Sequence, residues 1–158
     1  MTYGVTPKQM LGRLPYFAAV DRQVFDGRDL ASVRTQQLRF ARCSFVGADL
    51  RHATLDGCFF KMCDFRGANL RGASLRGARL AGCDLRDADL RDADLTGGLL
   101  GNVNTGSHPY GLTDVTGANF ANARLHDLEV DRVIGWRTPH ARRACRSGRP
   151  AAALAPPR

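Results

Sequence analysis

Three cysteines spaced 20 positions apart, Cys43, Cys63 and Cys83, are the residues whose type and spacing most suggest chemistry. If 20 residues make one turn of a coil, the three thiols stack in one column, which could bind a metal ion or take part in redox reactions. However, the same slot holds Ala elsewhere in the chain, and a buried Cys behaves as a small apolar residue. Because no Cys-x-x-Cys pair or nearby His completes a zinc ligand set, we predict a structural role, with no metal and no cofactor.

Arginines recur with the same spacing and could form a second column on the outside of such a coil. A ladder of cations could bind phosphate groups. Each of these arginines also stands two positions from an Asp or Asn, which favours the alternative of a mixed surface whose charges neutralise each other. The Asp and Asn side chains can also bond to the local backbone at corners. The residues concerned are Arg51, Arg71 and Arg91, with Asp49, Asn69 and Asp89.

Histidines, which are common catalytic residues, are scattered along the chain. They stand at positions 52, 108, 126 and 140, and no motif pairs any of them with a Ser or Cys nucleophile. The sequence also lacks a phosphate-binding glycine loop and a His-Glu-x-x-His zinc motif. We therefore predict that the protein is not an enzyme.

An internal repeat of five residues must position these side chains. Every fifth position from Phe25 to Leu100 is Leu or Phe at 15 of 16 places, and from Cys43 to Gly98 the residue two positions earlier is small. Five steps turn an α-helix by about 140° and alternate the faces of a strand, so neither element places these residues on one side. A coil does so if each five-residue unit forms one side with its small and large residues inward. The residues that we expect in its interior are Leu50, Leu55, Phe60, Phe65, Leu70, Leu75, Leu80, Leu85, Leu90, Leu95, Ala48, Ala53, Cys63, Ala68, Ala73 and Cys83.

The repeated unit, which is small, Asp or Asn, Leu or Phe, variable and Gly, resembles that of a known family. The segments A-D-L-R-D from Ala88, A-N-L-R-G from Ala68 and A-S-L-R-G from Ala73 match the A-(D/N)-L-x-x consensus of the pentapeptide-repeat proteins. The resemblance covers about two thirds of the chain. It implies an all-β fold, a right-handed quadrilateral β-helix with about four units per coil, in which successive coils lie about 4.8 Å apart.

Two segments are also similar to the quinolone-resistance members of that family. They are residues 25–50, where the repeat starts, and residues 130–138, where it ends. This second resemblance implies a protein partner, DNA gyrase, which is a type II topoisomerase. The protein would bind gyrase as a mimic of duplex DNA and protect it from antibiotics. The same resemblance implies a C-terminal helical segment that pairs two chains, but the sequence after Thr138 has no helical apolar pattern and leaves dimerisation open.

The repeat divides the chain into three regions. Residues 1–24 form an N-terminal cap, in which Thr6-Pro7-Lys8-Gln9 matches a capping box and begins a short helix. Residues 25–135 form the solenoid. Between residues 96 and 115 the consensus fades while the five-residue phase survives, so this stretch is either a degenerate coil or a loop of commensurate length. Its Gly, Asn and Pro content favours a loop, which is either a tolerated insertion or a contact site that uses His108 and Tyr110.

The formal net charge of +8 lies at the ends of the chain, because residues 26–130 carry 13 basic and 13 acidic side chains. Residues 136–158 form a tail rich in Arg, Ala and Pro, which we predict to be disordered. Such a tail could bind nucleic acid weakly, so the alternative function is a nucleic-acid-associated protein that uses the tail and the arginine column. We expect a cytoplasmic location and no membrane association, because no apolar run is long enough to span a membrane and no signal peptide is evident.

Overall fold

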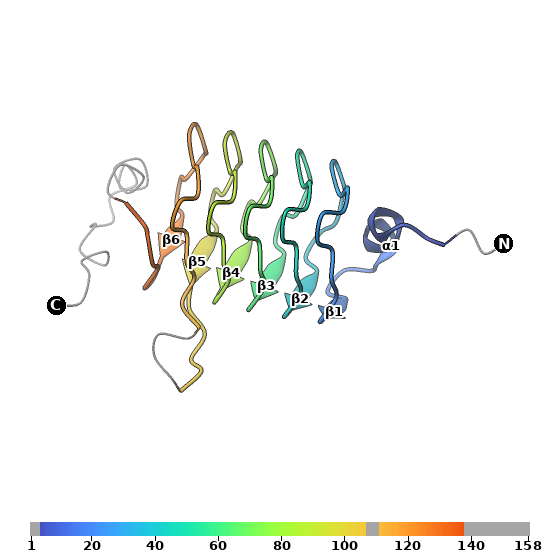
Figure 1. Cartoon of the computed structure of the whole chain (residues 1–158), viewed down its shortest axis with the longest axis horizontal. Coiled ribbons are helices and arrows are strands. Elements are labelled where there is room, and N and C mark those ends of the chain that lie inside the picture. The colour runs from blue at the N-terminus through green and yellow to red at the C-terminus, as the bar shows by residue number, and fades with distance from the viewer. Residues whose placement is uncertain (1–3, 107–110, 138–158) are drawn as a thin grey trace.

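Short parallel strands, stacked one beside another, form the framework of the molecule. The computed structural model describes residues 4–106 and 111–137. Figure 1 shows the strands along the long axis, one from each successive turn of the chain. They form one six-stranded parallel sheet in chain order. The strands are β1 (Ala19–Asp21), β2 (Arg39–Ala41), β3 (Phe59–Lys61), β4 (Arg79–Ala81), β5 (Leu99–Gly101) and β6 (Glu129–Val130).

Each coil takes 20 residues as far as β5. Phe40 of β2 pairs with Phe60 of β3, and Leu80 of β4 and Leu100 of β5 continue the same line. Three further ladders of isolated parallel bridges run beside the sheet with the same spacing. The coil therefore has four sides, and the protein is a right-handed quadrilateral β-helix, as the resemblance implies.

We name the four faces of the coil in chain order. The strand face carries the strands β1 to β6. The second face contains the ladder of Ser44, Asp64, Asp84 and Asp114. The third face contains the ladder of Asp49, Asn69, Asp89 and Asn119. The fourth face contains the ladder of Thr54, Ser74, Asp94 and Arg124.

Large apolar side chains fill the interior of the coil in columns, one column for each face. Two of these columns contain stacked aromatic rings. The rings of Phe40 and Phe60 stack with their centroids 4.9 Å apart, and those of Phe45 and Phe65 with theirs 4.7 Å apart. All 16 residues that we expected in the interior are 3% exposed or less. Because the ring spacing equals the ordinary distance between paired strands, the rise of the coil permits continuous stacking.

The corners of the coil hold a left-handed backbone at the residue two positions after the large one, except after Leu100, where the chain leaves the coil. Glycine adopts this conformation without strain, as at Gly67, where φ is 63°. Other residues also occupy such corners, and His52 and Met62 both have a φ of 56°. The backbone N–H of His52 donates to the carbonyl of Arg71 in the next coil, 3.1 Å away. Bonds of this kind between coils hold the corner even where the residue type disfavours it.

A short helix covers the N-terminal end of the coil. Helix α1 (Pro7–Arg13) begins with the expected capping box, in which the Thr6 hydroxyl accepts from the Gln9 backbone and the Gln9 side chain accepts from the Thr6 backbone. Leu11 packs into the apolar core and is buried. Figure 1 shows α1 beyond β1, at the N-terminal end of the stack. The helix therefore shields a strand edge that could otherwise pair with another chain.

The stack is interrupted between β5 and β6. Leu99 pairs with Glu129, 30 positions later, whereas the earlier coils advance by 20. The additional residues leave the coil as a loop, whose base is closed where the Val103 N–H donates to the Gly111 carbonyl at 2.7 Å. Thr113 then resumes the coil in phase. Within residues 96–115, Leu99–Gly101 and the residues from Thr113 onward therefore belong to the coils, and only the residues between them depart from the 20-residue spacing.

Three parts of the chain lie outside the described residues, namely 1–3, 107–110 and 138–158. The expected disorder of the C-terminal tail concerns residues from position 138 onward, and the question of a helical segment that pairs two chains also concerns these residues. The candidate contact residues His108 and Tyr110 also lie there. In residues 4–106 and 111–137, no helix is long and apolar enough to cross a membrane.

Candidate binding surfaces

The stacked cysteines line the interior of the second face, and their thiols donate to backbone carbonyls of the preceding coil. The donor and acceptor pairs are Cys43 to Val20 at 3.3 Å, Cys63 to Phe40 at 3.7 Å and Cys83 to Phe60 at 3.3 Å. In the next coil Thr113 fills the same slot, and its hydroxyl donates to the Leu80 carbonyl at 3.2 Å. A small side chain that can donate a hydrogen bond therefore suits this slot better than Ala.

Burial and mutual proximity keep the thiols of Cys43 and Cys63 protonated. The neighbouring thiol of Cys63, together with burial, raises the pKa of Cys43 far above its ordinary value. The hydrogen bond with Cys43 lowers the pKa of Cys63, but the bond with Cys83 and burial outweigh it and raise this pKa to about 12. Because the thiolate is the reactive form, Cys43 and Cys63 are poor nucleophiles and metal ligands. In the described part of the chain, no group of three or more His, Cys, Asp or Glu residues could hold a metal ion.

Arginine and aspartate side chains pair within their own repeats on the third face. Arg51 holds Asp49 through two contacts, with Nη2 2.7 Å from Oδ2 and Nε 2.9 Å from Oδ1. Arg91 and Asp89 repeat this geometry with the same two distances. The hydrogen bond from its arginine lowers the pKa of each aspartate, so both carboxylates stay ionised. These arginines are therefore neutralised by their neighbours and are not free cations.

Arg71 differs because its repeat has Asn69 in place of an aspartate. Its Nε lies instead 3.2 Å from Oδ2 of Asp92 in the next coil. Asn69 keeps the second role of its position, since its Oδ1 accepts from the backbone N–H of Arg71 at 3.2 Å. The Asp and Asn side chains of the third face thus fix the adjoining corner whether or not they carry a charge.

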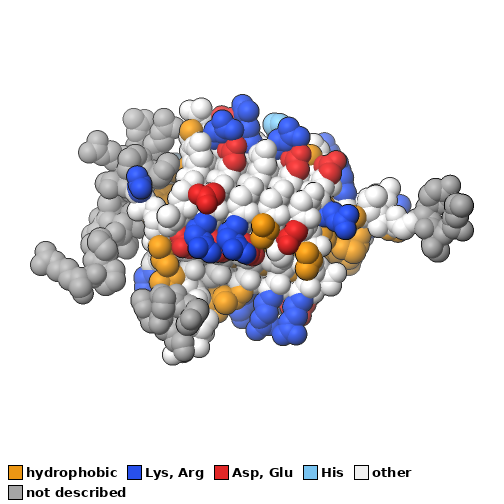
Figure 2. Space-filling view, in the orientation of Figure 1, with side chains coloured by type: hydrophobic (Ala, Val, Ile, Leu, Met, Phe, Trp, Pro, Cys, Tyr) orange, Lys and Arg blue, Asp and Glu red, His pale blue; other side chains and the backbone are white. Residues whose placement is uncertain are grey.

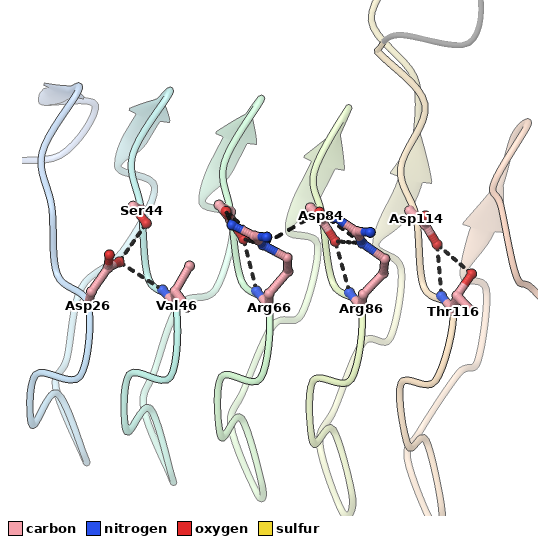
Figure 3. A network of polar contacts seen from close by, with 9 residues as sticks. Asp26, Ser44, Val46, Arg66, Asp84, Arg86, Asp114 and Thr116 are labelled. Atoms are coloured by element: carbon pink, nitrogen blue, oxygen red, sulfur yellow. Dashed lines mark hydrogen bonds and ion pairs between the residues drawn. The ribbon is translucent and has the colours of Figure 1, made fainter.

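A second ladder of the same kind runs along the second face, as Figure 3 shows. Asp64 pairs with Arg66 at 2.7 Å, and Asp84 pairs with Arg86 at 2.6 Å. The Nε of Arg66 also lies 3.8 Å from Asp84, so the ladder joins two coils. The spacing of Asp and Arg two positions apart is the same as on the third face and could have revealed this ladder in the sequence.

Two faces of the coil are therefore covered by charges that are already paired. Figure 2 shows Lys or Arg side chains directly beside Asp or Glu side chains across the middle of the view. Exposed ion pairs contribute only about 0–1 kcal/mol each to stability. They nevertheless hold long side chains in defined positions, so these faces are ordered surfaces of low net charge.

The stacked coils and their paired surface charges define a β-solenoid built from units of five residues. Eight copies of the model for pentapeptide repeats match the chain, within residues 29–61, 43–80 and 63–102. The chain belongs to the pentapeptide-repeat family, whose members are generally structural or binding proteins and not enzymes.

Solved structures share the fold. The structure of Rfr23, a pentapeptide repeat protein from the cyanobacterium Cyanothece 51142, has a TM-score of 0.67 and 17% sequence identity, over 77% of this chain and 90% of that one. Trypsin-treated QnrB1, a plasmid-mediated fluoroquinolone resistance protein, has a TM-score of 0.49 and 19% identity, over 75% of this chain and 62% of that one. At 17% identity the likeness to Rfr23 concerns the fold alone. A comparison with curated protein sequences found no significant match.

Proposed function

We propose that this protein is a non-catalytic binding protein that presents the rigid faces of its solenoid to a protein partner. The observation that carries the proposal is the order of the surface, because backbone ladders fix the coils and Asp–Arg pairs fix the side chains on them. A surface that is ordered before binding loses less entropy when a partner docks. Membership of the pentapeptide-repeat family supports the same role.

The partner that we propose is DNA gyrase, with protection from antibiotics directed at gyrase as the consequence. The support is the similarity of residues 25–50 and 130–138 to the quinolone-resistance members of the family. Because arginines neutralise acidic side chains on the second and third faces, contact would depend on shape and on the loop between Val103 and Gly111 more than on acidic imitation of DNA. The proposal implies a cytoplasmic location.

A supercoiling assay with purified gyrase, with and without a fluoroquinolone, tests the gyrase proposal. We expect the protein to change the yield of supercoiled DNA or to restore that yield in the presence of the drug. Deletion of residues 103–112 removes the loop and returns the coil to its 20-residue spacing, so this variant should keep its fold and lose part of the effect. Gyrase that responds identically with and without folded wild-type protein, at micromolar concentration, would contradict the proposal.

The broader proposal of a protein partner has a separate test. The tagged protein is used for a pull-down from a bacterial lysate before and after treatment with nuclease. We expect captured protein partners to persist after nuclease treatment. If all of them disappear, the chain associates with nucleic acid and holds proteins only through it.

A further inference from the structure

The middle of the strand face differs from the ladders of the second and third faces because its cations lack acidic partners. Four exposed basic side chains project from β2, β3 and β4 and from the adjoining corner, and we call them the basic patch. They are Arg39, Arg42, Lys61 and Arg79. In residues 4–106 and 111–137, none of the four forms an ion pair with a carboxylate, whereas the arginines of the ladders on the second and third faces all do.

The sequence explains the excess of positive charge. The segments 38–42, 58–62 and 78–82, which carry the middle of the strand face, contain no Asp or Glu. The acidic residues of this face stand at its ends, in β1, in β6 and directly after β6. Figure 2 shows a group of Lys and Arg side chains at the lower edge of the view, on the side where Figure 1 labels the strands.

The acidic side chain at the corner between the fourth face and the strand face already has hydrogen-bond partners within the chain. Asp56 accepts hydrogen bonds from the Ser74 hydroxyl and, at 3.1 Å, from the backbone N–H of Arg76. It therefore serves the fourth face and the corner of the coil. The positive charge of the basic patch remains available to a partner from outside the chain.

An aromatic side chain lies at the centre of the basic patch. Phe59 of β3 pairs with Arg39 of β2 on one side and with Arg79 of β4 on the other, so the three form one outward column. Phe59 is only partly buried, whereas the neighbouring Phe60 is 1% exposed and belongs to the core. With strands about 4.8 Å apart, the two arginines flank the ring at a separation of about 10 Å between their backbones.

We propose that the strand face binds single-stranded nucleic acid, with backbone phosphates on the basic patch and a base stacked on Phe59. Cations that follow the backbone, combined with an aromatic ring for the bases, are the means by which proteins bind single strands without sequence preference. A flat sheet face offers no helix or ribbon that could enter a groove of duplex DNA. An acidic protein segment would satisfy the cations but would make no particular use of the ring. The proposed site uses neither the paired arginines of the third face nor residues 138–158.

Fluorescence anisotropy on the full chain, with a labelled oligothymidylate of about 15 nucleotides, tests this proposal. The patch variant combines Arg39→Gln, Arg42→Gln, Lys61→Gln and Arg79→Gln. The control variant combines Arg51→Gln, Arg66→Gln, Arg86→Gln and Arg91→Gln, which lowers the net charge equally but removes arginines that are ion-paired. Both variants keep the tail, so any difference between them belongs to the patch.

We expect the patch variant to lose about tenfold or more in affinity, and the slope of log affinity against log salt concentration to fall by up to about 3, with much smaller changes in the control. Circular dichroism checks that both variants fold. Phe59→Leu provides an independent measurement, because it keeps an apolar side chain on the strand. It should weaken binding about fivefold or more and leave the salt slope unchanged, since stacking is not an ionic contact.

Equal losses in the patch and control variants would overturn the proposal, because binding would then follow net charge alone. Equal affinity for a duplex of the same length, together with no effect of Phe59→Leu, would also overturn it. Binding of a labelled polyglutamate peptide that depends on the patch, without binding of oligothymidylate, would assign the strand face to an acidic protein. Loss of oligothymidylate binding in the patch variant and in Phe59→Leu, with the control retaining it, is the result that we expect.

Discussion

The small inward residue of the repeat is Ala along most of the third and fourth faces but Cys or Thr on the second face. The reason lies in single hydrogen bonds, because the thiols of Cys43, Cys63 and Cys83 and the hydroxyl of Thr113 all donate to carbonyls of the preceding coil. The buried thiols of Cys43 and Cys63, whose pKa values are raised, are also chemically inert. The column that first suggests metal or redox chemistry is thus explained by packing and by hydrogen bonding.

The inertness of these thiols leads to a prediction about their reaction with DTNB. In the variant Cys145→Ser, labelling reports only on the four buried cysteines of the coil. We expect the folded protein to react at least about 100-fold more slowly than the protein in denaturant, because the reagent cannot reach four thiols that are 1% exposed or less. Ellman absorbance against time measures both rates. Rapid labelling of the folded protein would mean that the column opens or ionises easily.

At the scale of the coil, the inward columns could be predicted from the sequence, because a fixed period with alternating small and large residues decides which side chains point inward. The partner of Arg71 could not, since an arginine can reach an acidic residue in its own coil or in the next one. The basic patch was in principle visible, because Arg39, Phe59 and Arg79 stand one coil apart. These three residues come together only when the 20-residue coils are aligned with one another, whereas a single five-residue unit shows only charge pairs within itself.

The inward assignment of the small slot can be tested by adding volume. Ala73 is fully buried, so Ala73→Leu should destabilise the protein by about 1–3 kcal/mol through overpacking. Ser74 is only partly buried, so Ser74→Leu should cost less, although it removes the hydrogen bond to Asp56. Urea unfolding followed by circular dichroism compares the two variants. Equal unfolding midpoints would be incompatible with the described register.

At the scale of the whole molecule, the N-terminal end of the stack is closed by α1. Leu11→Asp would place a carboxylate in the apolar contact beneath this helix, where it has no partner. We expect α1 to detach and the exposed first coil to associate with other chains. Light scattering during gel filtration measures the association.

A matched control for this prediction is Gly12→Asp. It adds the same charge at an exposed position of α1, where a new Cβ would meet only the Arg34 carbonyl at 3.9 Å. This variant should behave as the wild type does in gel filtration. If Leu11→Asp elutes in the same way as Gly12→Asp and melts at the same temperature, α1 does not protect the end of the coil.

The parallel stacking of the coils also determines how the molecule comes apart. Each coil is bonded to the coil before it and the coil after it, so the solenoid resembles a chain of links held by nearest neighbours. Releasing a terminal link breaks one set of bonds, whereas opening a central link breaks two. Unfolding therefore begins at the ends of the solenoid and proceeds inward one coil at a time. A nucleic acid strand bound across β2, β3 and β4 would contact three coils at once, and it would stabilise them against unfolding that spreads from either end.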